Sequence, residues 1–98
     1  MNERHEILST LEANSEVLKA SGVRSIGLFG SMARGDATST SDLDFIVDLK
    51  LKTFDAYMDV KEMLEKWFGR SVDLVLDDAV KPVLRERIRK ETVHAAGF

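Results

Sequence analysis

The stretch GSMARGDATSTSDLDFIVD, residues 30–48, joins two small residues to a polar loop and then to carboxylates that alternate with hydrophobic residues. The pattern from Leu43 to Leu49 predicts a strand, in which successive side chains point to opposite faces. A strand built only for a core would not need carboxylates at its start. Asp42 and Asp44 are therefore the first candidates for a functional role.

Asp42 and Asp44 are two residues apart, so on an extended strand they point the same way with Cα atoms about 6.5 to 7 Å apart. Two carboxylates held together repel each other and resist ionisation unless a cation lies between them. Magnesium fits best, because it is usually held by one or two carboxylates with waters and substrate phosphates. Asp48 shares their parity but lies about 13 Å from Asp44, so we leave it out of the site.

Asp73 interrupts the apolar run SVDLVL, residues 71–76, which predicts another strand. A carboxylate in such a strand is costly to bury without a partner charge. We expect Asp73 to be a third metal ligand or a base, if its strand lies beside that of Asp44. The alternative is a residue that faces solvent at the edge of the sheet.

Gly30 and Ser31 follow the apolar run 23–29, which predicts a buried strand, and open a short predicted helix. Such a junction can offer backbone N–H groups and the Ser31 hydroxyl to a phosphate. Gly30 and Gly35 have P-loop spacing, but Asp36 replaces the required lysine. A phosphate cradle beside two or three carboxylates indicates phosphoryl or nucleotidyl transfer with metal ions.

The rest of the chain alternates helical and strand patterns. Apolar spacing predicts helices over 3–20, 54–68 and 79–93, and Pro82 falls in the first turn of the last one. This alternation favours a small α/β fold, a short mixed sheet flanked by helices. A stripe of large side chains along the middle helix is assigned to the core, or to a partner interface if one face is exposed. Its side chains are Tyr57, Met58, Trp67 and Phe68.

Length and composition limit the classes of protein. The 98 residues suit one domain, 1–98, and a net charge of −3 argues against direct DNA binding and weakens an RNA role. The absence of cysteine excludes disulfides and thiolate metal sites. We find neither a signal peptide nor a membrane span, and therefore expect a cytoplasmic protein.

Other charged residues receive plainer interpretations. Capping by Asp77 and Asp78 is expected to start the last helix. His5 and His94 lack neighbours at metal-ligand spacing and are assigned to the surface. A cationic cluster near the end of that helix is interpreted as a solvated face suited to the helix dipole, with nucleotide or acidic-partner binding as the alternative. Its members are Arg85, Arg87, Arg89 and Lys90.

The motif GS, ten intervening residues and DxD, followed by an aspartate on a later strand, resembles the nucleotidyltransferases of the DNA polymerase beta superfamily. The stretches GSMARGDATSTSDLDFIVD, VDLVL and KPVLRERIRKETV are similar, more closely, to the minimal nucleotidyltransferases, or MNT proteins, which act as antitoxins beside HEPN-domain toxins. The resemblance covers nearly the whole chain from Val23 to Val93. Its central motif is specific, because small residues, loop length and both aspartates must coincide.

The resemblance implies roles for particular residues. Gly30 and Ser31 would hold the triphosphate of ATP, with Arg34 as a supporting phosphate contact. Asp42 and Asp44 would bind two magnesium ions. Asp73, as the third carboxylate, would help to hold one ion and would act as the base toward the acceptor hydroxyl.

The partner implied by the resemblance is a cognate HEPN toxin, which would receive AMP on a tyrosine. Association with this toxin or with a second copy of the chain is left open, as is the base preference of the donor. Two alternatives also remain: an antitoxin that acts by binding alone, and nucleotidyl transfer to a small molecule.

Overall fold

The computed structural model of the protein describes residues 3–35 and 42–98. Apart from Gly35, the polar loop expected at 35–41 lies outside the described residues, and so does Asp36. No helix within the described ranges is both long enough and apolar enough to cross a membrane.

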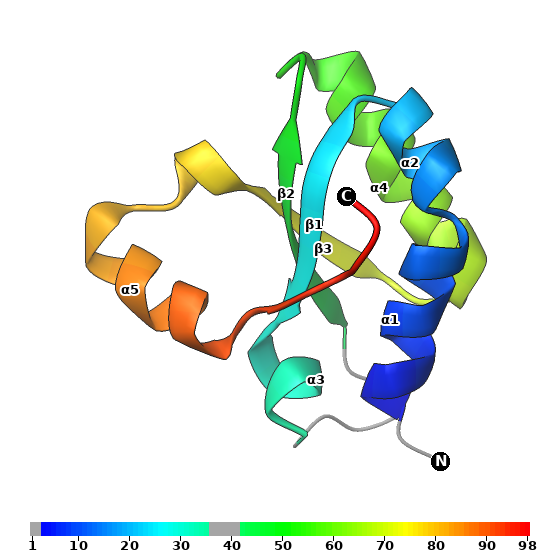
Figure 1. Ribbon diagram of the computed structural model, residues 1–98. Coiled ribbons are helices and arrows are strands. Elements are labelled where there is room, and N and C mark those ends of the chain that lie inside the picture. The colour runs from blue at the N-terminus through cyan, green and yellow to red at the C-terminus, as the bar shows by residue number, and fades with distance from the viewer. Residues whose placement is uncertain (1–2, 36–41) are drawn as a thin grey trace.

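The described strands form one mixed sheet in the order β3-β2-β1-β4 (Figure 1). β1 (Val23–Phe29) runs antiparallel to β2 (Leu43–Leu49) and to β4 (Val93–His94). β2 runs parallel to β3 (Val72–Leu76), which lies at the edge. The predicted strands over 23–29 and 43–49 are confirmed, and so is the α/β fold with a short mixed sheet.

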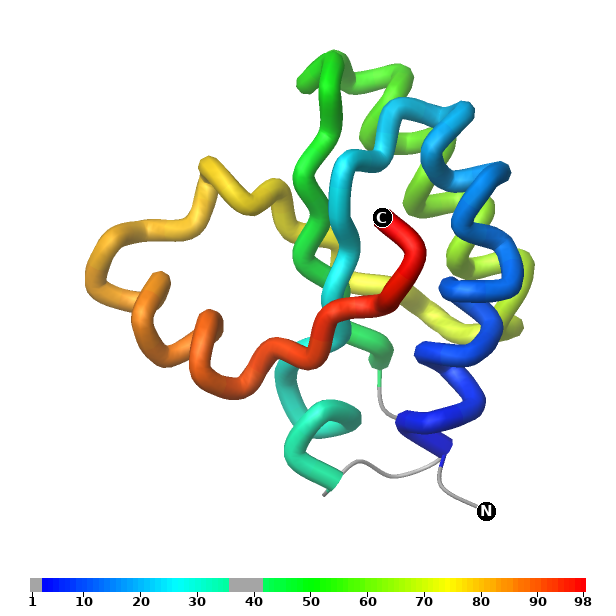
Figure 2. The backbone as a smooth tube through the Cα atoms, in the orientation of Figure 1, coloured from blue at the N-terminus to red at the C-terminus, as the bar shows by residue number. Residues whose placement is uncertain are grey.

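The helices are distributed unequally around this sheet (Figures 1 and 2). α1 (Glu3–Ala13), α2 (Ser15–Ala20) and α4 (Phe54–Phe68) pack on one face. α3 (Gly30–Arg34) follows the end of β1 directly, and α5 (Pro82–Glu91) lies away from the other three on the opposite side. The helix predicted over 54–68 is confirmed.

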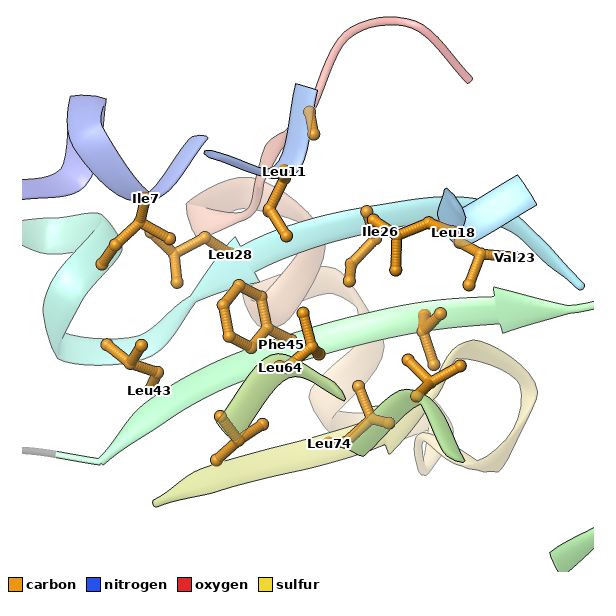
Figure 3. Close-up of a cluster of buried hydrophobic side chains, with 14 of the residues drawn as sticks. Ile7, Leu11, Leu18, Val23, Ile26, Leu28, Leu43, Phe45, Leu64 and Leu74 are labelled. Atoms are coloured by element: carbon orange, nitrogen blue, oxygen red, sulfur yellow. The ribbon is translucent and has the colours of Figure 1, made fainter. Parts of the chain in front are cut away.

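We call the face of the sheet under α1, α2 and α4 the packed face. Strand alternation places Leu43, Phe45, Val47 and Leu49 there, and each of them is buried. Figure 3 shows their cluster with Leu11, Leu64 and other side chains of the helices. Phe45 also stacks on Phe68, with ring centroids 5.8 Å apart. This cluster is the hydrophobic core.

The opposite side of the sheet, the open face, has a different composition. Five residues of β2 and β3 lie on it, and none of them is fully buried. They are Asp44, Ile46, Asp48, Asp73 and Val75.

The predicted first helix over 3–20 is interrupted. The helix ends at Ala13, and a second one begins at Ser15. The Asn14 side-chain amide donates to the Thr10 carbonyl over 2.8 Å. Asparagine favours such local bonds over a continuous helix, and this accounts for the break that apolar spacing did not reveal.

The end of the chain differs more from the prediction. Asp77–Ala79 form a short 3₁₀ helix, η1, and α5 begins at Pro82 with Lys81 as its N-cap. The helix predicted over 79–93 was therefore too long, and capping by Asp77 and Asp78 was wrong. Thr92 adopts an extended conformation, and the next two residues form β4 on the free edge of β1.

Gly27 explains why β4 can approach β1 so closely. A Cβ atom at this position would lie 2.5 Å from Cγ2 of Thr92 and 3.2 Å from Cδ2 of His94. The missing side chain therefore makes room for the turn from α5 into β4. A glycine inside a strand is a weak sequence signal, and β4 was not predicted.

The stripe of large side chains predicted on α4 is half-buried, as expected for a helix that packs on a sheet. Tyr57, Trp67 and Phe68 pack against the core. The Tyr57 hydroxyl donates to the Leu74 carbonyl of β3 over 2.7 Å and ties the helix to the edge strand. Phe54, which begins the helix, is instead 75% exposed.

Candidate active site

Gly30 joins β1 to α3 and lies against the strand that carries the carboxylates. Its φ of +75° is in the left-handed region that favours glycine. A Cβ atom at this position would overlap the Asp44 carboxyl group. Two independent requirements therefore select glycine here, and the chain turns into α3 directly beside Asp44. Ser31 follows in α3 and is half-buried.

Asp44 and Asp73 are register partners on the parallel strands β2 and β3. Neighbouring residues in register point to the same face, so the two carboxyl groups lie side by side on the open face. Asp42 precedes β2 by one residue and is exposed. Asp73 is exposed on the edge strand, but the register directs it toward the Asp44 side of the sheet.

Electrostatics also connect these groups. Partial burial raises the pKa of Asp44 above its usual range, and the charges of Asp73 and Asp42 raise it further. Arg34 acts in the opposite direction, while Glu91 adds to the increase. Asp44 is thus the centre of an acidic region whose charge is incompletely compensated by protein cations.

The acidic groups are not gathered into a complete ligand set. Within residues 3–35 and 42–98, no three His, Cys, Asp or Glu side chains lie close enough together to hold a metal ion. The charges of Asp73 and Asp42 nevertheless raise the pKa of Asp44. Carboxylate oxygens are the ligands that Mg²⁺ prefers, and a divalent cation would relieve their repulsion, so the donor set fits magnesium.

Arg34 extends from α3 to the end of α5. Its Nη1 lies 3.0 Å from Oε2 of Glu91, with 43% of the Arg34 side chain exposed. This pair joins the glycine–serine junction to the helix on the open face. Glu91 was not singled out in the sequence, because 57 positions separate it from Arg34 and no local pattern connects the two.

A second feature of the open face was also missed by the sequence. A groove with a volume of about 200 Å³ lies between the sheet and α5. We call it the α5 groove; it is bordered by Ile46, Asp48, Asp77, Arg85, Ile88 and Arg89, among others. Its walls come from segments far apart in the chain, so only the tertiary structure brings them together.

The cationic cluster of α5 divides between two sides. Arg85 and Arg89 border the α5 groove, whereas Arg87 and Lys90 line a separate outer hollow. All four residues are exposed, but they lie on two sides of the helix and not on the single face that the sequence predicted. His94 also borders the α5 groove, and His5 is exposed on α1.

A mixed sheet in which a glycine–serine junction packs against paired strand carboxylates defines the nucleotidyltransferase class. Residues 6–94 match the family described as "Polymerase beta, Nucleotidyltransferase". The chain belongs to this family, which is a family of enzymes.

Individual relatives agree with this assignment. The chain is 36% identical over 91 residues to the protein adenylyltransferase MntA of Thermococcus cleftensis, covering 91% of this chain and 92% of MntA. A solved structure assigned as a minimal nucleotidyltransferase is 34% identical, with a TM-score of 0.71 and coverage of 88% and 93% of the two chains. A chain of a toxin–antitoxin structure that contains MntA is 25% identical, with a TM-score of 0.66 and coverage of 100% and 74%. The resemblance to minimal nucleotidyltransferases is confirmed.

Proposed function

We propose that this chain is a magnesium-dependent adenylyltransferase that transfers AMP from ATP to a tyrosine hydroxyl of a HEPN-domain toxin and so acts as its antitoxin. The observation that carries the proposal is the position of Asp44, beside Asp73 in register and against Gly30 at the start of α3. The similarity to an MntA adenylyltransferase over nine-tenths of both chains supports AMP as the transferred group. The similarity to a toxin–antitoxin structure supports the kind of partner.

Each site residue has a role in this proposal. Gly30 and Ser31 bind the triphosphate, and Arg34 lies in the same helix as a further phosphate contact. Asp42, Asp44 and Asp73 would hold magnesium. When bound, magnesium neutralises the phosphate charge and stabilises the oxygens that attack and leave.

The proposed transfer conserves atoms and charge without any other reactant. The acceptor oxygen forms a bond to the α-phosphorus as the bond to the pyrophosphate oxygen breaks. Pyrophosphate leaves, and the hydroxyl proton passes to the Asp73 carboxylate, which is exposed and therefore accessible to an acceptor.

Labelled ATP provides the direct test. The purified chain, incubated with magnesium, labelled ATP and the toxin encoded beside it, should label the toxin. Asp42→Asn or Asp44→Asn should abolish the label, whereas Asp59→Asn, at an exposed position of α4, should not. Labelling that persists in the presence of a chelator would contradict the metal role, and labelling without any protein partner would favour a small-molecule acceptor.

The second candidate function is an antitoxin that acts by binding alone. It is favoured by the similarity to a chain of a toxin–antitoxin structure, because an antitoxin can act by occupying its toxin. A protection assay in cells that produce the toxin distinguishes the two candidate functions. The double variant Asp42→Asn with Asp44→Asn still protects them if binding suffices, and fails to protect them while still forming the complex if transfer is required.

A further inference from the structure

The α5 groove lies on the same face of the sheet as the candidate active site but includes none of its residues. Ile46 and Asp48 of β2 contribute to its floor, and Arg85 and Ile88 of α5 form a wall. Asp77 borders it just after β3. The proposed transfer assigns no role to this groove.

We propose that the α5 groove binds the adenine base of the nucleotide donor. This inference rests on the proposed function, because it assumes that the phosphates lie at Asp44 and Gly30. Ile46 is two residues along β2 from Asp44, about 6.5 to 7 Å by the strand rise. A nucleotide with its α-phosphate at the carboxylates can therefore reach Ile46 with its base across one ribose.

The lining suits a purine ring. Ile46 and Ile88 offer apolar surface to the ring faces, and a guanidinium such as that of Arg85 can stack on a base. Arg85 is held at the groove by its Nη2, which donates to the Val80 carbonyl over 3.3 Å. The carboxylates of Asp48 and Asp77 can accept hydrogen bonds from an exocyclic amino group such as that of adenine.

The size of the groove supports a base rather than a whole nucleotide. Its volume of about 200 Å³ is below the ~300 to 1,000 Å³ of pockets that enclose complete drug-sized ligands. The triphosphate must therefore lie outside the groove. Asp44 and the start of α3 at Gly30, which packs against the Asp44 carboxyl group, lie outside the groove at the end of the same sheet face.

An acceptor tyrosine of the partner fits the groove less well. A ring that entered with its hydroxyl first would place that group near Ile46 and Asp48, two to four residues along β2 from Asp44. The hydroxyl would then be remote from the phosphorus that it must attack. A tyrosine also offers one polar group, whereas the groove presents both donors and acceptors.

Nucleotide affinity tests the assignment independently of transfer. Dissociation constants for ATP and for inorganic tripolyphosphate are measured by calorimetry, with magnesium present, for the unaltered chain and three variants. Ile88→Trp fills the groove from α5, and Arg85→Ala removes part of its wall. The matched control is Arg87→Ala, which removes the same charge from the outer side of the same helix.

We expect Ile88→Trp to weaken ATP binding about tenfold or more, the order of the contribution of one stacked base. Its affinity for tripolyphosphate should not change. Arg85→Ala should weaken ATP binding more than Arg87→Ala does. α5 has no fully buried residue, so these variants should fold.

The other outcomes overturn the assignment in distinguishable ways. If the unaltered chain binds ATP no more tightly than tripolyphosphate, or if ATP binding is equal in all variants, the base does not occupy the groove but the phosphate site stands. If transfer falls while ATP binding is unchanged, the groove belongs to the acceptor. If the unaltered chain binds neither compound, the proposed function fails as well.

Discussion

The two faces of β2 come from the same seven residues but serve different purposes. Toward α1, α2 and α4, alternate positions are apolar and buried, and Phe45 is the largest of them. Toward α5, the positions between them are Asp44, Ile46 and Asp48, all of which keep some contact with solvent. The packed face stabilises the fold, whereas the open face retains repulsive charge that the fold does not need. Substitutions one position apart should therefore have opposite consequences.

The largest effect is expected on the packed face. Phe45→Ala removes a fully buried ring that stacks on Phe68, and such changes cost about 3–5 kcal/mol of folding free energy. Urea unfolding followed by circular dichroism measures the loss. Val75→Ala, on the open face, is the control and should cost clearly less because Val75 is only half-buried. Equal losses would contradict the division into two faces.

The opposite response is expected at the next position. Asp44→Asn should lower the rate of AMP transfer by more than the ~10- to 100-fold typical of residues that merely support a metal ligand. The same variant should be at least as stable as the unaltered chain at neutral pH. The raised pKa means that this carboxyl group favours the folded state only when protonated at low pH, and this contribution is lost as the pH rises through the folded-state pKa.

Asparagine avoids the cost of an ionised carboxylate at position 44, although solvent screening keeps the gain below about 1 kcal/mol. Transfer assays and thermal unfolding of the same preparation separate the two effects. A variant that lost activity and also became much less stable would indicate a structural role for Asp44.

Gly30 begins α3 against the Asp44 carboxyl group, and its substitution should show an intermediate effect. Gly30→Ala introduces a side chain at a left-handed φ and against the Asp44 carboxyl group, which should cost about 1–3 kcal/mol. Gly35→Ala is the matched control. Its φ of +83° carries a similar backbone penalty, but no described atom lies within 4 Å of the added Cβ. If both variants lose the same free energy of unfolding, the contact between the added Cβ atom and the Asp44 carboxyl group contributes nothing to the cost.

The smallest effect concerns the charge around Asp44. Glu91→Gln should lower the pKa of Asp44, because Glu91 raises it, and Arg34→Ala should raise the pKa, because Arg34 lowers it. Carboxyl carbon chemical shifts, followed by NMR as the pH is changed, measure both. If the pKa of Asp44 changed in the same direction in both variants, the two side chains would not act on Asp44 through charge.

Local patterns in the sequence predicted most of the scaffold. An apolar run defined the strand over 23–29, alternation defined the strand over 43–49, and apolar helical spacing defined α4. β4 was missed because two residues carry no periodicity and depend on Gly27 to leave space. The break at Asn14 depended on a side-chain hydrogen bond that competes with helix geometry.

The candidate site was predictable only in part, for a related reason. Asp42, Asp44 and Gly30 belong to one short stretch, and Asp73 was recognised as a charge within an apolar strand. Glu91 and the α5 groove depend on how α5 returns over the sheet between η1 and β4. That return is set by contacts between distant segments, which no local pattern reports.

α5 also has an evolutionary consequence. It contributes no fully buried residue, and it is attached at one end through η1 to β3 and at the other through β4 to β1. Mutations along its exposed positions should therefore cost little folding free energy. Descendants of such a protein can therefore change the exposed surface of this helix while they keep the same sheet and the same core.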